Sequence, residues 1–234
     1  MRNVFFVIIM CLFCIVISRQ GFAQQGAPVT VSEILGEKKE CNFDWDKDGD
    51  FPRGFKSALT GKGNPGRWFV MKIEHAPTND NVVVQVKHDK TDYRFPLLIL
   101  DDVDYKDATA WVWFRAIDGQ VDQSGGLVFR YKDENNYYVL RANALENNVR
   151  LYKVVNGKRI QIGSKNTPVT ANEWHLLKVL YDGNRLACFY ENTKIMEIMD
   201  DTFDSGSIGL WTKSDSYTYF DTLVVQEAYK VSEK

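Results

Sequence analysis

The sequence predicts an all-β protein, a sandwich of two antiparallel sheets with about fourteen strands in one domain. Short runs rich in Val, Ile, Tyr, Phe and Trp follow one another and are broken by turn residues. After the first forty residues, no segment keeps a helical apolar period over three turns. Because helical segments do not alternate with the strands, a parallel sheet is not expected.

Residues 1–23 are predicted to be a secretory signal peptide. An apolar run from Val4 to Ile17 is followed by the small residues Gly21 and Ala23, which suit cleavage before Gln24. The run is short for a membrane span, which needs about 20 apolar residues, although a transmembrane anchor is the alternative. No later segment could span a membrane, so the mature protein is expected to be secreted or periplasmic.

The rest of the chain divides into three parts. Residues 24–38 are polar, contain Gly and Pro, and are expected to form a flexible leader. Residues 39–229 are expected to form the sandwich domain, and residues 230–234 a tail. No internal repeat or low-complexity linker divides the domain.

The strands of the domain are assigned in order from these apolar runs. Asn156-Gly157 and Asp182-Gly183 are hairpin signals between two pairs of runs. Strands are expected at Cys41–Trp45, Trp68–Glu74, Val82–Lys87, Leu97–Leu100, Ala108–Ile117, Gly126–Tyr131, Tyr137–Asn143, Val149–Val155, Arg159–Ile162, Trp174–Tyr181, Arg185–Tyr190, Ile195–Ile198, Ser207–Thr212 and Tyr219–Gln226.

Alternation along the strands assigns their faces, because successive side chains point to opposite sides of a sheet. Ala110, Val112, Phe114 and Ala116 form a uniformly apolar set and are predicted to face the core. The same argument assigns aromatic and polar side chains to the non-core faces: Trp111, Trp113, Arg115, Arg130, Tyr137, Arg141, Asn143, Lys178, Trp211 and Lys213.

One strand needs separate mention because of its arginine. Leu127, Phe129 and Tyr131 are predicted to point inward, which leaves Val128 and Arg130 on the opposite face.

A surface with this chemistry suits a carbohydrate. Aromatic rings stack on the apolar faces of sugar rings, and Arg, Lys and Asn donate hydrogen bonds to hydroxyls and carboxylates. The predicted ligand is therefore a poly- or oligosaccharide, including an anionic one. Strand order is not known from sequence, so these residues could lie on two outer faces, and the alternative is an ordinary solvated face.

The order of the motifs resembles that of a known superfamily. The segments Gln123–Tyr131 and Asn135–Asn143 resemble the central hairpin of concanavalin A-like lectin/glucanase domains, and Asn172–His175, Gly206–Trp211 and Tyr219–Asp221 also match. More narrowly, the chain looks like the 3-keto-disaccharide hydrolase-like and laminin-G-like domains (family 16 glycoside hydrolase-like) of secreted bacterial proteins. The resemblance implies a curved jelly roll with a concave sheet that holds carbohydrate.

The resemblance leaves catalysis open. Family 16 glucanases use a Glu-x-Asp-x-x-Glu strand that places carboxylates side by side, and this chain has no such strand. Glu146 and Asp215 are the candidate catalytic residues, with loop carboxylates in surface ion pairs as the alternative. The hypotheses are a carbohydrate-binding domain, a glycoside hydrolase acting on (3-keto-)disaccharides or related glycosides, and a laminin-G-like adhesion module.

A structural calcium ion is a further expectation. Asp44, Asp46 and Asp48 match the first half of a calcium loop, but Phe55 stands where the twelfth-position Glu belongs. The resemblance adds Asp221, because an acid of the last strand joins the first strand in calcium sites of that superfamily. A solvated acidic turn is the alternative.

Composition and cysteine content exclude other classes. The 234 residues are 44% hydrophobic and carry a formal charge of −2, which argues against disorder and against a dedicated nucleic-acid binder. Gly61–Gly66 contains Pro65 and precedes no helix, so it is a turn and not a phosphate loop.

Cys41 and Cys188 remain after signal cleavage, either as a disulfide or as two small buried side chains.

Overall fold

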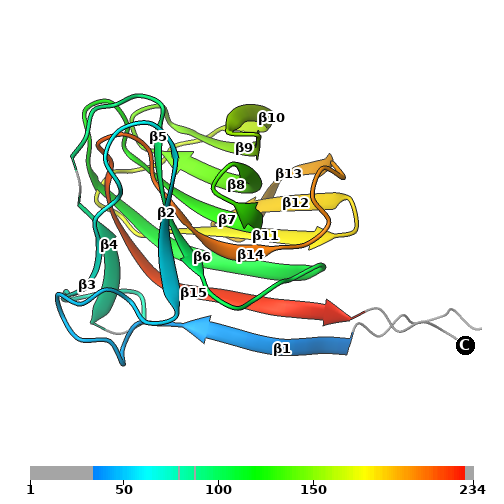
Figure 1. The fold of residues 1–234 in the computed structure, drawn as a ribbon, viewed down its shortest axis with the longest axis horizontal. Coiled ribbons are helices and arrows are strands. Elements are labelled where there is room, and N and C mark those ends of the chain that lie inside the picture. The colour runs from blue at the N-terminus through cyan, green and yellow to red at the C-terminus, as the bar shows by residue number, and fades with distance from the viewer. Residues whose placement is uncertain (1–33, 79, 87, 230–234) are drawn as a thin grey trace, which may run out of the picture. The chain divides into compact units, whose positions relative to one another are not determined.

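The computed structural model describes residues 34–78, 80–86 and 88–229, which form fifteen strands in two antiparallel sheets and contain no helix (Figure 1). The predicted all-β sandwich is confirmed. The eight-stranded sheet runs in the order β13 (Thr193–Met199), β12 (Arg185–Tyr190), β11 (His175–Asp182), β6 (Ala108–Asp118), β15 (Tyr217–Tyr229), β4 (Asn81–Gln85) and β3 (Trp68–Lys72), with β1 (Ile34–Cys41) also paired to β15.

The seven-stranded sheet contains the segment that carried the superfamily resemblance. Its order is β10 (Lys158–Asn166), β9 (Asn148–Val155), β8 (Asn136–Asn143), β7 (Ser124–Asp133), β14 (Ser207–Trp211), β5 (Arg94–Leu100) and β2 (Phe55–Gly61).

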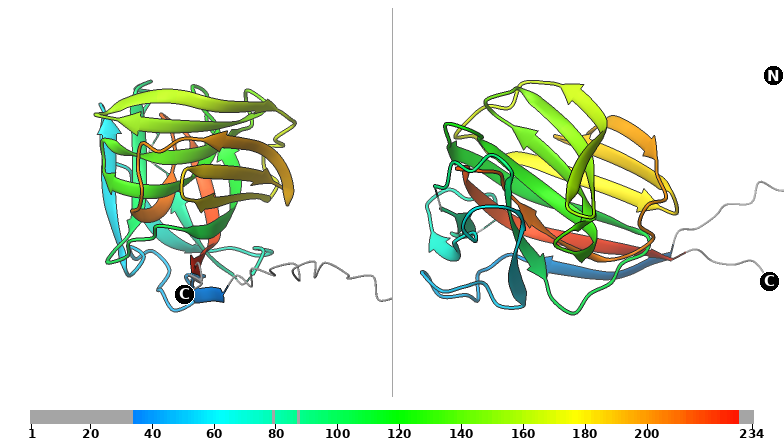
Figure 2. Two further views of the ribbon diagram at one scale, coloured as in Figure 1. Left: turned by 90° about the vertical axis from the view of Figure 1, so that its right-hand side faces the viewer. Right: turned by 45° about the horizontal axis from the view of Figure 1, so that its top comes forward.

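The long strand β15 organises the eight-stranded sheet. One of its edges pairs with β6, and its other edge pairs first with β4 and then with β1. Figure 1 and Figure 2 show β1 running beside β15. The last strand of the domain therefore holds the first strand in place.

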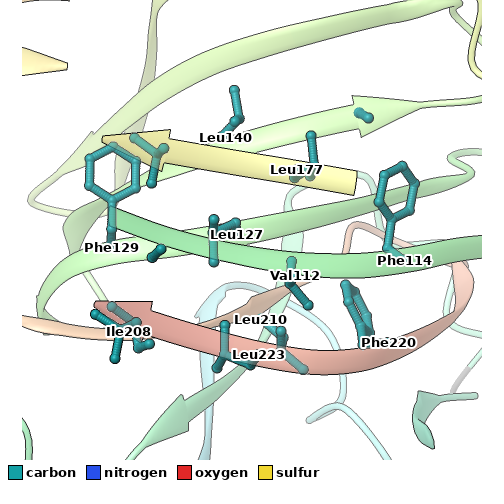
Figure 3. Close-up of a cluster of buried hydrophobic side chains, with 14 of the residues drawn as sticks. Val112, Phe114, Leu127, Phe129, Leu140, Leu177, Ile208, Leu210, Phe220 and Leu223 are labelled. Atoms are coloured by element: carbon teal, nitrogen blue, oxygen red, sulfur yellow. The ribbon is translucent and has the colours of Figure 1, made fainter. Parts of the chain in front are cut away.

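The main core lies between the two sheets. Val112 and Phe114 of β6 and Leu223 of β15 face Leu127 of β7 and Leu140 of β8, all of them buried (Figure 3). The apolar set that alternation assigned to the core of Ala108–Ile117 is confirmed.

A second apolar cluster covers the opposite face of the seven-stranded sheet. All ten of its buried members belong to that sheet, and they are Phe95, Leu97, Ile99, Val128, Tyr131, Tyr137, Val139, Tyr152, Val154 and Trp211. This sheet is therefore apolar on both faces, which explains the fully buried run of β5.

Three element predictions are corrected. The leader was expected to reach residue 38, but residues 34–38 belong to β1, because their backbone pairs with β15 while the polar side chains of Glu37 and Lys38 are exposed to solvent. Strand β2 was not predicted, since alternation is poor in its sequence. The strand expected at Cys41–Trp45 ends at Cys41, and the chain then turns.

A β-bulge in β7 changes the predicted faces of two residues. Ser207 of β14 pairs with Tyr131 and Gly209 pairs with Val128, so β7 has one residue too many. Arg130 sits in this bulge with a φ of 48°. An extra residue inverts the alternation beyond it, so Tyr131 joins the second cluster and Arg130 turns to the side of Tyr181 in the main core.

Candidate functional site

The ten residues assigned to the non-core faces do not form one surface. Trp111, Trp113 and Arg115 lie half-buried on the outer face of the eight-stranded sheet. Lys178 of β11 is the register partner of Trp111 and borders the same pocket of about 260 Å³. This Trp111 pocket is also lined by Thr109, Leu176 and Asn192.

Arg130 has a structural position. Its guanidinium donates to the carbonyl oxygens of Phe203 (2.9 Å), Lys106 (2.8 Å) and Gly183 (2.8 Å) and lies 5.2 Å from the Tyr181 ring centroid. The side chain is fully buried. It ties three loops together, and the prediction that it lies outward with the other basic residues is wrong because of the β7 bulge.

Tyr137 and Trp211 lie on the predicted face of the seven-stranded sheet but are fully buried. The Arg159 guanidinium lies 4.6 Å from the ring centroid of Phe95 and 5.9 Å from that of Trp211. The backbone N–H of Arg159 donates to the Tyr93 hydroxyl at 2.7 Å. The β9–β10 hairpin thus covers the aromatic part of this face, which leaves its charged end for a ligand.

The charged end of the same face carries Arg141, Asn143 and Lys213, the other three predicted residues. Arg141 donates through Nη2 to Glu146 Oε2 at 3.0 Å, to Asn148 Oδ1 at 3.1 Å and to the Tyr152 hydroxyl at 3.3 Å. Lys213 lies close enough for its charge to help lower the pKa of Glu146, and it pairs with Asp92 and Asp122. We call the surrounding group the Arg141 site, and it consists of Asp92, Asp122, Arg141, Asn143, Glu146, Asn148, Arg150, Tyr152 and Lys213.

Register explains why these residues meet. Arg150 of β9 pairs with Arg141 of β8, and Asn148 pairs with Asn143. Asn143 accepts from the backbone N–H groups of Leu145 and Glu146 through its Oδ1, which fixes the tight β8–β9 turn. The turn in this way places Glu146 over both arginines.

Several buried donors of the site have no acceptor within the described residues. They are Nε and Nη1 of Arg141, Nδ2 of Asn143 and Nε of Arg150, and Arg141 is only 2% exposed. Buried polar groups are normally hydrogen-bonded, so these donors require an oxygen acceptor from water or from a ligand. Glu146 and Arg150, which are partly exposed, form the rim.

The site holds charges of both signs. Burial opposes ionisation of Glu146, but the Asn148 hydrogen bond and the charges of Arg141 and Arg150 outweigh it and lower the pKa of the carboxyl. Lys213 Nζ lies 2.9 Å from Asp92 Oδ1 and 3.3 Å from Asp122 Oδ2. Carboxylates held in place this way can accept hydrogen bonds from sugar hydroxyls, and the cations can donate hydrogen bonds to them.

The two candidate catalytic residues differ in position. Glu146 belongs to the Arg141 site, where its lowered pKa favours the anion and disfavours service as a general acid near neutral pH. Asp215 accepts from the backbone N–H groups of Gln120, Val121 and Asp122. Burial opposes its ionisation, yet these hydrogen bonds lower its pKa, so Asp215 anchors a loop.

Three of the four predicted calcium ligands accept hydrogen bonds within the protein. Asp46 accepts from Arg53, Asp48 accepts from the Lys72 N–H, and buried Asp221 accepts from the Thr78 N–H and hydroxyl. No group of three or more His, Cys, Asp or Glu within the described ranges is arranged to hold a metal ion. The donor set does not fit calcium without rearrangement, and the calcium expectation stays a prediction.

Cys41 and Cys188 are free, so the disulfide reading gives way to its alternative of two separate small side chains. Cys188 is buried in the main core and Cys41 packs against it from the end of β1. Burial raises the pKa of the Cys41 thiol to about 11 and that of the Cys188 thiol to about 12.

Sequence reasoning missed part of the Arg141 site. Arg150 and Tyr152, which follow Asn148 at a period of two along β9, share the face of Arg141. The period of two was available as a signal in the sequence. Asp92 and Asp122 lie in loops far apart in the chain, and only the fold brings them to Lys213.

The fold places the chain among β-sandwich domains, an architecture that it shares with solved carbohydrate-binding domains. No family model matches the chain, so the narrower resemblance to 3-keto-disaccharide hydrolase-like domains stays a prediction.

Two solved structures illustrate this likeness. The CBM66 carbohydrate-binding module from Bacillus subtilis has a TM-score of 0.59 at 20% identity, over 76% of this chain and 96% of the module. Domain 4 of AbnA, an extracellular arabinanase from Geobacillus stearothermophilus in complex with arabinotriose, has a TM-score of 0.55 at 13% identity, over 85% and 95% of the two chains. At these low identities, the TM-scores show a shared fold alone.

One curated protein is similar in sequence. A levanase of Bacillus subtilis (strain 168) is 30% identical over 94 residues, which cover 40% of this chain and 14% of the levanase.

No helix among the described residues is long and apolar enough to cross a membrane.

Proposed function

We propose that this domain is an exported carbohydrate-binding domain and that the Arg141 site holds the sugar. The observation that carries the proposal is the nearly buried guanidinium of Arg141, which keeps Nε and Nη1 without an acceptor in the described structure. A sugar hydroxyl or ring oxygen supplies such an acceptor.

The charge pattern favours a neutral sugar over a strongly anionic one. Arg141 and Arg150 are offset by Glu146, which lies 3.0 Å and 3.2 Å from them. Lys213 is offset by Asp92 and Asp122. A hydroxyl both donates and accepts, so a polyhydroxylated ligand uses both kinds of group at once.

The similar proteins support the ligand class and suggest the first probes. One is a levanase, and one structure neighbour was solved with arabinotriose. Levan and arabinan fragments are therefore the first probes, within a wider polysaccharide panel. The predicted signal peptide supports export, although residues 1–23 lie outside the described residues.

The test is binding to this panel by calorimetry, using the chain from Gln24 onward. Arg150→Met and Glu146→Gln alter partly exposed residues at the rim, so both variants are expected to fold. We expect either substitution to weaken binding about tenfold, a loss of about 1.4 kcal/mol. Arg185→Met is the matched control, because Arg185 forms an exposed ion pair with Glu197 on the other sheet.

The results separate the two faces. Lys178→Met alters the Trp111 pocket and is expected to leave affinity unchanged. Loss of binding in Lys178→Met together with unchanged binding in the rim variants would assign the sugar to the Trp111 pocket instead. Release of new fragments from a probe, seen by mass spectrometry, would establish the hydrolase alternative.

A further inference from the structure

A pocket at the junction of the two sheets is lined by Trp45, the most exposed large apolar side chain among the described residues. Trp45 is 86% exposed. It borders a cavity of about 350 Å³ with Phe43 and Phe55 and with four polar side chains, those of Glu40, Asn42, Asp46 and Arg53. Small-molecule sites have volumes of about 300–1,000 Å³. The cavity lies at the lower end of this range, which suits a single sugar ring.

The exposure of Trp45 does not come from a loosely held loop. Asn81 Nδ2 donates to the carbonyl oxygens of Phe43 and Asp46, both at 3.1 Å. Arg53 donates to the Trp45 carbonyl and, at 2.6 Å, to Asp46 Oδ1. The loop is thus held by Asn81 of β4 and by Arg53 near the C-terminal end of the loop itself.

Backbone pairing with the neighbouring strand adds to this. The Gly49 N–H donates to the Val70 carbonyl and the Val70 N–H donates to the Asp50 carbonyl, both at 2.8 Å. A large aromatic ring held in water by a rigid loop is preorganised for a ligand, because little conformational freedom is lost on binding.

The lining favours a sugar over a purely apolar partner. Trp45 offers an aromatic face, while Glu40, Asn42 and Asp46 offer oxygens and Arg53 offers N–H groups around the same cavity. Sugar rings present apolar C–H faces and polar hydroxyl edges, which match this division. The Cys41 thiol in the wall is protonated near neutral pH, since its pKa is raised to about 11.

The pocket is separate from the Arg141 site. Its walls come from the end of β1, the start of β2 and the loop between them, whereas Arg141 lies on β8. Strands β7, β14 and β5 lie between β8 and β2 in the sheet order.

We propose that the Trp45 pocket is a second carbohydrate subsite, in which one sugar ring stacks on the indole. The ligand class rests on the proposed function, and the location rests on the pocket itself. Two subsites on one domain would raise the apparent affinity for a polymer above that for a short oligosaccharide.

The test uses the indole N–H signals of the 15N-labelled chain from Gln24, which contains the sequence's six tryptophans. Levan and arabinan fragments and the same polysaccharide panel are titrated, and Trp45→Phe identifies the Trp45 signal. We expect this signal to shift on binding. Trp45→Ala is expected to weaken polymer binding about fivefold, while Trp45→Phe keeps a ring and loses less.

The outcomes separate this inference from the proposed function. An unmoved Trp45 signal and unchanged affinity in Trp45→Ala, while Arg150→Met still weakens binding, overturn the subsite and leave the Arg141 site standing. Shifts at Trp45 with no effect of Arg150→Met support the subsite and overturn the Arg141 site. No binding to any probe overturns both. Thermal unfolding of each variant checks that the loop remains folded.

Discussion

Two buried arginines of the seven-stranded sheet differ in their hydrogen-bond contacts. Arg130 donates to three carbonyl oxygens and lies against a tyrosine ring, and within the described residues its Nε alone lacks an acceptor. Arg141 meets protein acceptors through Nη2 alone, and both its Nε and its Nη1 lack an acceptor among the described residues. Contacts and not burial therefore distinguish a structural arginine from a candidate ligand group.

Arg130→Met is expected to destabilise the domain by about 2–5 kcal/mol, because three carbonyl oxygens lose a charged donor. Urea unfolding followed by circular dichroism measures this loss. Carbohydrate affinity of the folded variant is expected to match that of the natural chain. A variant as stable as the natural chain would contradict the structural role.

Tyr137→Phe tests a predicted ligand residue that the fold buries. The Thr60 hydroxyl donates to the Glu134 carbonyl, so the Tyr137 hydroxyl donates to Thr60 Oγ1 at 2.8 Å. Loss of this bond is expected to cost about 1 kcal/mol and leave affinity unchanged. The double-mutant cycle with Thr60→Val, by urea unfolding, should show coupling between the two positions. Independent effects would mean that the bond does not form.

At the scale of elements, short insertions and pairings decide which face a residue occupies. The β7 bulge moves Tyr131 into the second cluster and Arg130 toward the main core. Gly206 lies against this bulge with a φ of +148°, and a Cβ there would meet the backbone of Arg130 at 2.4 Å. The bulge therefore requires a glycine at position 206.

The segment between β13 and β14 gives the domain an acid-sensitive contact. Burial opposes ionisation of Asp200, but hydrogen bonds from Lys153 (2.7 Å), Thr202 (3.0 Å) and Tyr138 (2.5 Å) outweigh it and hold the pKa of Asp200 well below its usual range. The carboxylate thereby links β8 and β9 to the segment that enters β14.

Because the folded-state pKa of Asp200 is lowered, its contribution to stability is present above the ordinary pKa of about 3.8 and is lost as the pH falls toward the folded value. Asp200→Asn is expected to be less stable than the natural chain at pH 7. The difference in unfolding free energy should shrink between about pH 4 and pH 2. A difference that is constant over this range would contradict the assignment.

At the scale of the whole molecule, the sandwich is held by its inter-sheet core and not by a covalent crosslink among the described residues. Cys41 and Cys188 are free thiols in or beside that core. Strand β1 is held to the domain by backbone pairing with β15.

A reducing agent is therefore expected to leave the melting temperature of the chain from Gln24 unchanged. Denatured protein should show two titratable thiols, and the folded protein should react slowly at pH 7.5 because the pKa of the Cys41 thiol is raised to about 11. A mass lower by two hydrogens under non-reducing conditions would reveal a disulfide and contradict this expectation.

The sequence by itself determined the fold class, most strands and the core face of β6, since apolar alternation is a local property and one buried face fixes it. It also placed Arg141, Asn143 and Lys213 among the aromatic and polar residues of the non-core faces. The tertiary structure alone decided that these residues share one site while Trp111, Trp113 and Arg115 lie on the other sheet, because strand order depends on pairings between distant segments. It likewise decided that Tyr137 and Trp211 are covered, since the β9–β10 hairpin folds over them, and that β1 is a strand, since its pairing with β15 joins the two ends of the domain.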